Sequence, residues 1–105
     1  MTKVTVLGLS GCSLCDSLKS LLFDEDITYS FVDVNKQGRI ADFVEELLKV
    51  ETYPIVILEK GRNVTYIYRA EESGQLGKRS KNDNLIKIGV FTIPDIVTTI
   101  KNELK

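Results

Sequence analysis

The sequence predicts a single α/β domain with a small central mixed sheet, flanking helices and an inserted loop or hairpin in its second half. Three observations support this fold class. The chain has 105 residues, the usual size of one domain, so residues 1–105 are assigned to one unit. Short apolar runs of strand length alternate with longer segments of helical periodicity. The first three segments follow the order strand, helix, strand, which is typical of a right-handed parallel βαβ unit.

The first half of the chain contains two predicted strands and two predicted helices. Residues 4–8 alternate β-branched and other apolar side chains, as a buried strand does. From Cys12 onward, leucines recur at helical spacing, and this helix is expected to end within residues 23–26. Residues 27–34 are predicted to form the second strand. Residues 40–48 have the apolar stripe of a second amphipathic helix.

The second half begins with a strand pair. Residues 55–58 are uniformly apolar and predict a strand, and the turn-like residues 60–63 lead to a hairpin partner at residues 64–68. Residues 71–84 are polar and contain two glycines, so we expect an exposed excursion there. Residues 85–91 return to apolar alternation.

A last helix follows these strands. Pro94 is suited to the first turn of a helix, and Asp95 beside it favours the same end. The apolar residues that follow have helical spacing. A central sheet with helices on its faces would bury all of these apolar stripes.

Composition excludes several classes of function. The chain has 14 basic and 15 acidic residues, a net charge of −1, and no block of basic residues, so nothing favours a nucleic-acid or anionic-membrane partner. The N-terminus lacks the pattern of a signal peptide, and no segment approaches the ~20 apolar residues of a membrane span. We therefore expect a monomer in the reducing cytoplasm, where a close cysteine pair is more often catalytic or metal-binding than structural.

The two cysteines, Cys12 and Cys15, are spaced so that they share one face of a helix. Such a pair suits redox chemistry or metal binding. The chain has no histidine, and two cysteines fall short of the four ligands of a structural zinc site, so no metal is expected.

The pair also falls where the first strand meets the first helix. Free N–H groups there favour a thiolate, which predicts a pKa for Cys12 below the usual ~8.5 and a role as the attacking nucleophile. Asp16 opposes this effect and makes it milder. Cys15 lies one turn further in and is expected to be the buried, resolving thiol.

Three stretches together resemble the glutaredoxin-like branch of the thioredoxin superfamily. They are residues 4–8 followed by Gly11-Cys12-Ser13-Leu14-Cys15-Asp16, then residues 27–34, then Thr52-Tyr53-Pro54. The resemblance implies a thioredoxin-like fold and a thiol–disulfide oxidoreductase that reduces protein or small-molecule disulfides in electron transport. It also implies that Thr52, Tyr53 and Pro54 bind substrate. Pro54 would be cis and face the dithiol, and Tyr53 would offer its backbone to the substrate.

The chain differs from glutathione-using members of that branch at several positions: Leu9, Ser13, Leu14, Glu51 and Val90. Two external reductants therefore remain open, namely glutathione and a thioredoxin reductase, with no bound cofactor. The resemblance implies disulfide-containing protein substrates, with ribonucleotide reductase among the candidates. An alternative of a different class is a non-catalytic binding module that docks a partner through its groove and residues 61–84.

Overall fold

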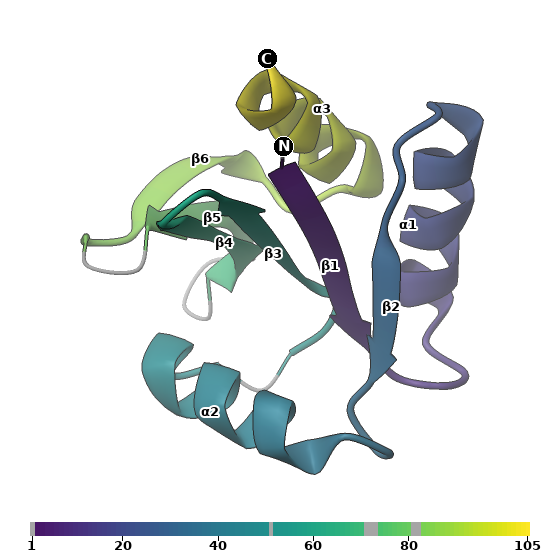
Figure 1. Cartoon of the computed structure of the whole chain (residues 1–105), viewed down its shortest axis with the longest axis vertical. Coiled ribbons are helices and arrows are strands. Elements are labelled where there is room, and N and C mark those ends of the chain that lie inside the picture. The colour runs from purple at the N-terminus through teal and green to yellow at the C-terminus, as the bar shows by residue number, and fades with distance from the viewer. Residues whose placement is uncertain (1, 51, 71–73, 81–82) are drawn as a thin grey trace.

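The structure is a computed structural model that describes residues 2–50, 52–70, 74–80 and 83–105. Its described part contains six strands and three helices, which follow in chain order: β1 (Thr2–Gly8), α1 (Ser13–Asp24), β2 (Ser30–Asp33), α2 (Gly38–Leu48), β3 (Ile55–Lys60), β4 (Asn63–Ala70), β5 (Gln75–Ser80), β6 (Ile86–Val90) and α3 (Ile93–Leu104). The strands form one sheet in the order β2-β1-β3-β4-β5-β6 (Figure 1). Only the β1–β2 pair in this sheet is parallel, so the sheet is mixed, as predicted.

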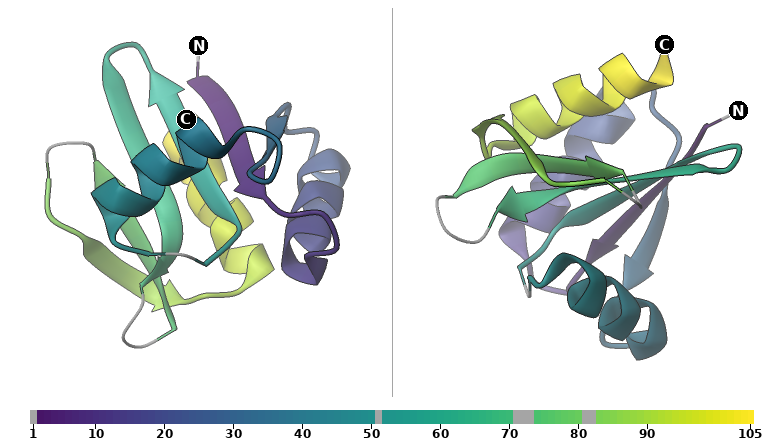
Figure 2. Two further views of the ribbon diagram at one scale, coloured as in Figure 1. Left: turned by 90° about the horizontal axis from the view of Figure 1, so that it is seen from below. Right: turned by 90° about the vertical axis from the view of Figure 1, so that its left-hand side faces the viewer.

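The helices lie on both faces of the sheet and make three layers. In Figures 1 and 2, α1 and α3 lie side by side over one face, and α2 covers the other. The face toward α1 and α3 is packed with buried apolar residues: Val4, Val6, Leu18, Leu22, Val56, Leu58, Ile67, Leu76, Phe91, Ile96, Val97 and Ile100. The face toward α2 holds a second cluster: Leu7, Val44, Leu48, Val50, Ile55, Tyr66 and Tyr68. Each helix thus buries part of the stripe that its periodicity predicted. Four apolar residues of those stripes are exposed instead: Leu14, Ile40, Phe43 and Leu104.

The ends of α3 and α2 have local causes. Thr92 is the N-cap of α3, and its Oγ1 accepts a hydrogen bond from the backbone N–H of Asp95 at 3.2 Å. Pro94 stands in the first turn, where its missing N–H costs nothing. Lys49 ends α2 in the left-handed conformation, with φ of 60°.

Residues 71–84 were predicted to be an exposed excursion, and this prediction is wrong for residues 75–80, whereas residues 83 and 84 are exposed. Residues 75–80 form β5, which pairs antiparallel with β4. Leu76 and Gly77 in it are buried. The two basic residues that made the stretch look solvated have partners, because Lys78 pairs with Glu103, and Arg79 Nη1 donates to the carbonyl of Leu47 at 2.9 Å. Residues 71–73 and 81–82 lie outside the described residues.

β6 forms one open edge of the sheet. All five of its residues are exposed, including Ile86, Ile88 and Val90. Its pairing with β5 has a register shift between Gln75 and Gly77, which is a β-bulge or a similar irregularity. Within the described ranges, no helix is long and apolar enough to span a membrane.

Candidate active site at the start of helix α1

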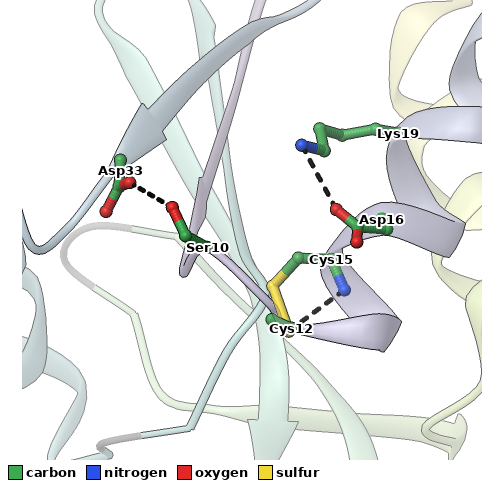
Figure 3. Close-up of polar contacts among 6 residues, drawn as sticks. All are labelled: Ser10, Cys12, Cys15, Asp16, Lys19 and Asp33. Atoms are coloured by element: carbon green, nitrogen blue, oxygen red, sulfur yellow. Dashed lines mark hydrogen bonds and ion pairs between the residues drawn. A yellow bond between two sulfur atoms is a disulfide. The ribbon is translucent and has the colours of Figure 1, made fainter.

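A tight turn brings the chain from β1 into α1. Gly11 has a φ of +79°, a conformation that glycine adopts without steric cost. Cys12 follows as the N-cap of α1, and its Sγ accepts a hydrogen bond from the backbone N–H of Cys15 at 3.1 Å (Figure 3). The predicted position of Cys12 at the helix N-terminus is confirmed. Its sulfur therefore sits where free N–H groups favour negative charge.

The two cysteines form a disulfide, with their Cα atoms 5.2 Å apart. Their exposure differs sharply, because Cys12 is half-buried and Cys15 has no exposed surface. The predicted difference in burial is thus confirmed. Of this pair, only Cys12 is partly exposed to an incoming molecule.

Gly8, the last residue of β1, makes room for the buried cysteine. A Cβ placed on Gly8 would lie 2.9 Å from Cys15 Sγ and 2.8 Å from Cε1 of Phe31. Both distances are shorter than contacts that real Cβ atoms show. Sequence reasoning treated Gly8 only as the end of an apolar strand. The signal available there was a glycine that ends a run of β-branched residues, which often marks a close approach.

A pair of polar residues holds the loop before Cys12. Ser10 Oγ donates a hydrogen bond to Asp33 Oδ2 at 2.8 Å (Figure 3), and the backbone N–H of Asn35 donates to Asp33 Oδ1 at 2.9 Å. These two hydrogen bonds, with Lys36 and Lys19 at longer range, hold the pKa of Asp33 below its ordinary value. Sequence reasoning missed Ser10 and Asp33, since neither forms a motif.

On the helix side of the disulfide, a second pair carries opposite charges. Lys19 Nζ lies 3.4 Å from Asp16 Oδ1 and 4.1 Å from the centre of the Phe31 ring. Asp16 is in the first turn of α1, where a carboxylate stabilises the helix. Its partner Lys19 offsets part of the repulsion that Asp16 would exert on a thiolate at Cys12.

Thr52, Tyr53 and Pro54 lie at the same end of the sheet as the disulfide. Leu7 pairs with Ile55 in the antiparallel β1–β3 register, so Pro54 comes level with Gly8, the neighbour of Cys15. The Tyr53–Pro54 peptide bond is cis, as the resemblance implies, and Pro54 is buried. Thr52 is exposed.

The phenol of Tyr53 points to α2. Its hydroxyl donates a hydrogen bond of 2.6 Å to Oε2 of Glu45, at a half-buried position. Sequence reasoning did not find Glu45, because a glutamate in an amphipathic helix looks like an ordinary surface residue. Glu51, one of the positions that differ from glutathione-using relatives, lies outside the described residues.

The arrangement gathers the chemistry that dithiol exchange needs. A half-buried cysteine stands at a helix N-terminus and is bonded to a fully buried one, and a cis-proline loop comes level with Gly8, the neighbour of Cys15. Among the described residues, no group of three or more metal-ligating side chains occurs.

Comparison with known proteins gives a family and a distant relative. The Gene 56 protein of Mycobacterium phage D29 is 24% identical over 58 residues, which cover 55% of this chain and 64% of the phage protein. The chain therefore spans less than two thirds of the length of that relative. No solved structure matches significantly.

The glutaredoxin family model matches residues 3–64, which include β1, the disulfide and the cis-proline loop. The family has a thioredoxin-like α/β fold, and the six-stranded sheet here is larger than that fold usually has. Because the match covers more than half of the chain, this protein belongs to the glutaredoxin family.

Proposed function

We propose that this protein is a thiol–disulfide oxidoreductase that reduces disulfides through Cys12 and Cys15. The observation that supports this most directly is the contrast between Cys12, which is half-buried at a helix N-cap, and Cys15, which is fully buried three residues later. The N–H of Cys15 already donates to Cys12 Sγ, and the same hydrogen bond would stabilise a thiolate there.

The proposed reaction transfers two electrons from the dithiol to the substrate. The Cys12 thiolate attacks one sulfur of the substrate disulfide, a Cys12–substrate bond forms, and the other substrate sulfur leaves as a thiolate. Cys15 then loses its proton to solvent and attacks Cys12 Sγ. The Cys12–substrate bond breaks, and the second substrate thiolate leaves. The protein ends with the Cys12–Cys15 disulfide, and both substrate thiolates take protons from water.

The opposite wall of the site is proposed to hold the substrate. Thr52, Tyr53 and Pro54 are the candidate binding residues, and the strand register supports their role by bringing Pro54 level with Gly8. The Tyr53–Glu45 hydrogen bond anchors the side chain of Tyr53 on α2. The Tyr53 backbone next to the proline is the proposed contact for a bound peptide or thiol.

An external reductant must restore the dithiol, and we propose glutathione or a thioredoxin reductase. Each would act on the Cys12–Cys15 disulfide by the same exchange chemistry. Protein substrates, with ribonucleotide reductase as one candidate, belong to this proposal, as does a cytoplasmic site of action.

The test is reduction of insulin and of bis(2-hydroxyethyl) disulfide by the wild type and by Cys12→Ser, with each reductant supplied separately. We expect activity with at least one reductant and none above background for Cys12→Ser. Without an added thiol, the Cys15→Ser variant should still form a mixed disulfide with the substrate but should not release its partner. A wild type no faster than Cys12→Ser with either reductant would instead support a non-catalytic binding module.

A second measurement addresses the nucleophile itself. Thiolate absorbance followed against pH in the reduced Cys15→Ser variant should give an apparent pKa for Cys12 below ~8.5. The matched control is Cys12→Ser, in which the buried Cys15 is left to titrate and should do so at higher pH. Equal apparent pKa values for the two cysteines would contradict the proposal that the helix N-terminus lowers the pKa of Cys12.

A further inference from the structure

One side of α1 leads from the disulfide to the far end of the helix. Cys12, Asp16, Lys19 and Phe23 follow one another at spacings of three or four residues, so they lie on one side of the helix. The backbone N–H of Asp16 donates to the carbonyl of Cys12 at 3.0 Å, which shows that the helical geometry includes Cys12. We refer to these four residues as the α1 stripe. Phe23 is eleven positions after Cys12, which corresponds to a distance of about 16 Å along the helix axis.

The stripe ends at an aromatic ring that is open to solvent. Phe23 is 78% exposed, more than any other large apolar side chain in the described part of the chain. A hollow of about 420 Å³ lies along the stripe, with Asp16, Lys19, Phe23 and Asp24 among its lining residues. A second hollow of about 340 Å³ adjoins it, and Phe23 and Tyr29 line both. Phe23, Tyr29 and Ile27, which line these hollows, together form an apolar patch that suits contact with an apolar group of a partner.

The surroundings of Phe23 are acidic. Asp16 and Asp24 line the first hollow and Asp26 lines the second, against the single cation Lys19, which already contacts Asp16 and the Phe31 ring. Among the described residues, no cation pairs with Asp24 or Asp26.

Asp24 and Asp26 also stand at the C-terminal end of α1, where the helix dipole disfavours negative charge. The carbonyl end of a helix is negative and favours basic residues, yet the last turn of α1 contains none. Glu25 there is paired with Lys101 of α3, which leaves the charge on Asp24 and Asp26 uncompensated. A cationic partner would therefore be attracted by both the side chains and the helix dipole.

We propose that the α1 stripe docks a cationic segment of the protein substrate. A lysine or arginine of that segment would face Asp24 or Asp26, which have no paired cation among the described residues, and an apolar side chain would rest against Phe23. An extended peptide of about five residues spans the distance from Cys12 to Phe23, so the apolar residue would lie about five positions from the substrate cysteine. This inference rests on the proposed function, since it needs a disulfide at Cys12.

The test uses three peptides that differ only in charge. Each has one cysteine, a leucine five positions away, and two intervening positions that are both lysine, both glutamate or both glutamine. Each peptide is supplied as a mixed disulfide with 2-mercaptoethanol, and kcat/KM is measured at low and high salt. We expect the lysine peptide to exceed the glutamate peptide by about fivefold or more, with the difference shrinking at high salt.

Two pairs of variants test whether the charge preference depends on the surface of α1 or on any exposed helix of the protein. Asp24→Lys should abolish or reverse the charge preference, and Phe23→Ala should lower kcat/KM for the lysine peptide by about fivefold. The matched controls are Asp42→Lys and Phe43→Ala on α2, which covers the other face of the sheet and where Phe43 is 59% exposed. Both controls should leave the preference of the wild type unchanged.

The outcomes are distinguishable. Full activity on bis(2-hydroxyethyl) disulfide with no preference among the peptides, or an equal effect of the α2 controls, would overturn the docking inference alone. No activity on any of these disulfides would overturn the proposed function and the docking inference with it.

Discussion

The two faces of the sheet are joined to their helices by different kinds of interaction. One face supports the helix that carries the disulfide, and the other is joined to α2, which contacts the cis-proline loop. The face under α1 and α3 is packed with aliphatic side chains and Phe91, and it supports the helix that begins at the disulfide. The face under α2 contains Tyr66 and Tyr68, and hydrogen bonds connect it to the helix. One of them joins Tyr53 to Glu45, and another joins Arg79 to the carbonyl of Leu47. Apolar packing is non-directional, whereas hydrogen bonds fix a particular geometry, so damage to the two faces should have different consequences.

On the face toward α2, burial keeps the hydroxyl groups of two tyrosines uncharged. Desolvation is the main cause that raises the pKa of both Tyr66 and Tyr68 above the ordinary value, so both phenols stay neutral at physiological pH. The cation near them, Arg79, acts in the opposite direction. The two phenols therefore add polar but uncharged groups to a mainly apolar face, in contrast to the acidic exposed side of α1.

The largest expected effect is loss of packing under α1. Leu18 is fully buried between α1 and the sheet, and Leu18→Ala should lower the free energy of unfolding by about 2–5 kcal/mol. Urea denaturation measures this loss. Phe23→Ala on the same helix removes a side chain that is 78% exposed and should cost much less. Equal losses would contradict the claim that α1 is held by its buried face.

The next largest effect is expected at Gly8, which lies beside Cys15 and level with Pro54. Gly8→Ala would force its Cβ against Cys15 Sγ and Phe31, which should destabilise the fold by about 1–3 kcal/mol and slow disulfide reduction. Gly38→Ala is the matched control, because a Cβ at Gly38 would meet no atom within 4 Å. Thermal unfolding and insulin reduction should both separate the two variants. An active, fully stable Gly8→Ala protein would show that Cys15 does not need this space.

A smaller effect should appear on the α2 face. Tyr53→Phe removes the hydroxyl that donates to Glu45, and we expect a loss of about 1 kcal/mol together with a raised KM for the disulfide substrate. Tyr66→Phe is the control, because among the described residues the Tyr66 hydroxyl makes no hydrogen bond, and Tyr66 lines neither hollow beside α1. If both variants changed KM equally, the hydrogen bond to α2 would have no role in positioning the loop.

The smallest effect is a pH dependence. The folded-state pKa of Asp33 is lowered, first by the Ser10 hydrogen bond and then by the Asn35 N–H. Its contribution to stability is therefore complete above the unfolded-state pKa of ~3.9 and is lost as pH falls through the lower, folded value. As the pH is lowered below 4, the melting temperature of Asp33→Asn should fall less than that of the wild type. An identical decline in both would exclude Asp33 as a contributor.

The site was predictable where sequence motifs coincide with local structure. Cys12 at the helix N-terminus, the burial of Cys15 and the cis bond before Pro54 all follow from short stretches of residues or from the resemblance that they support. Gly8 and Ser10 were not predictable in this way, because their roles depend on Phe31 and Asp33, each 23 residues further along the chain. Glu45 is only eight residues from Tyr53, but their contact depends on how α2 packs on the sheet.

The fold was predictable in its first half and less so in its second. The strand predicted at residues 27–34 is confirmed but shorter, at residues 30–33. β5 was missed because Lys78 and Arg79 give it the composition of a loop, while its stability comes from pairing with β4 and from partners on α3 and α2. Composition shows only the polarity of such side chains and not whether another element will neutralise them.

The irregular edge strand β6 has a consequence for how the chain behaves at high concentration. A regular strand with exposed isoleucines at a sheet edge offers unpaired N–H and C=O groups to a second chain and can start aggregation. The register shift next to Gln75 and Gly77 bends this ladder, and Lys87 adds a charge in the middle of the strand. Both features make a continuous sheet across the β6 edges of two molecules unfavourable.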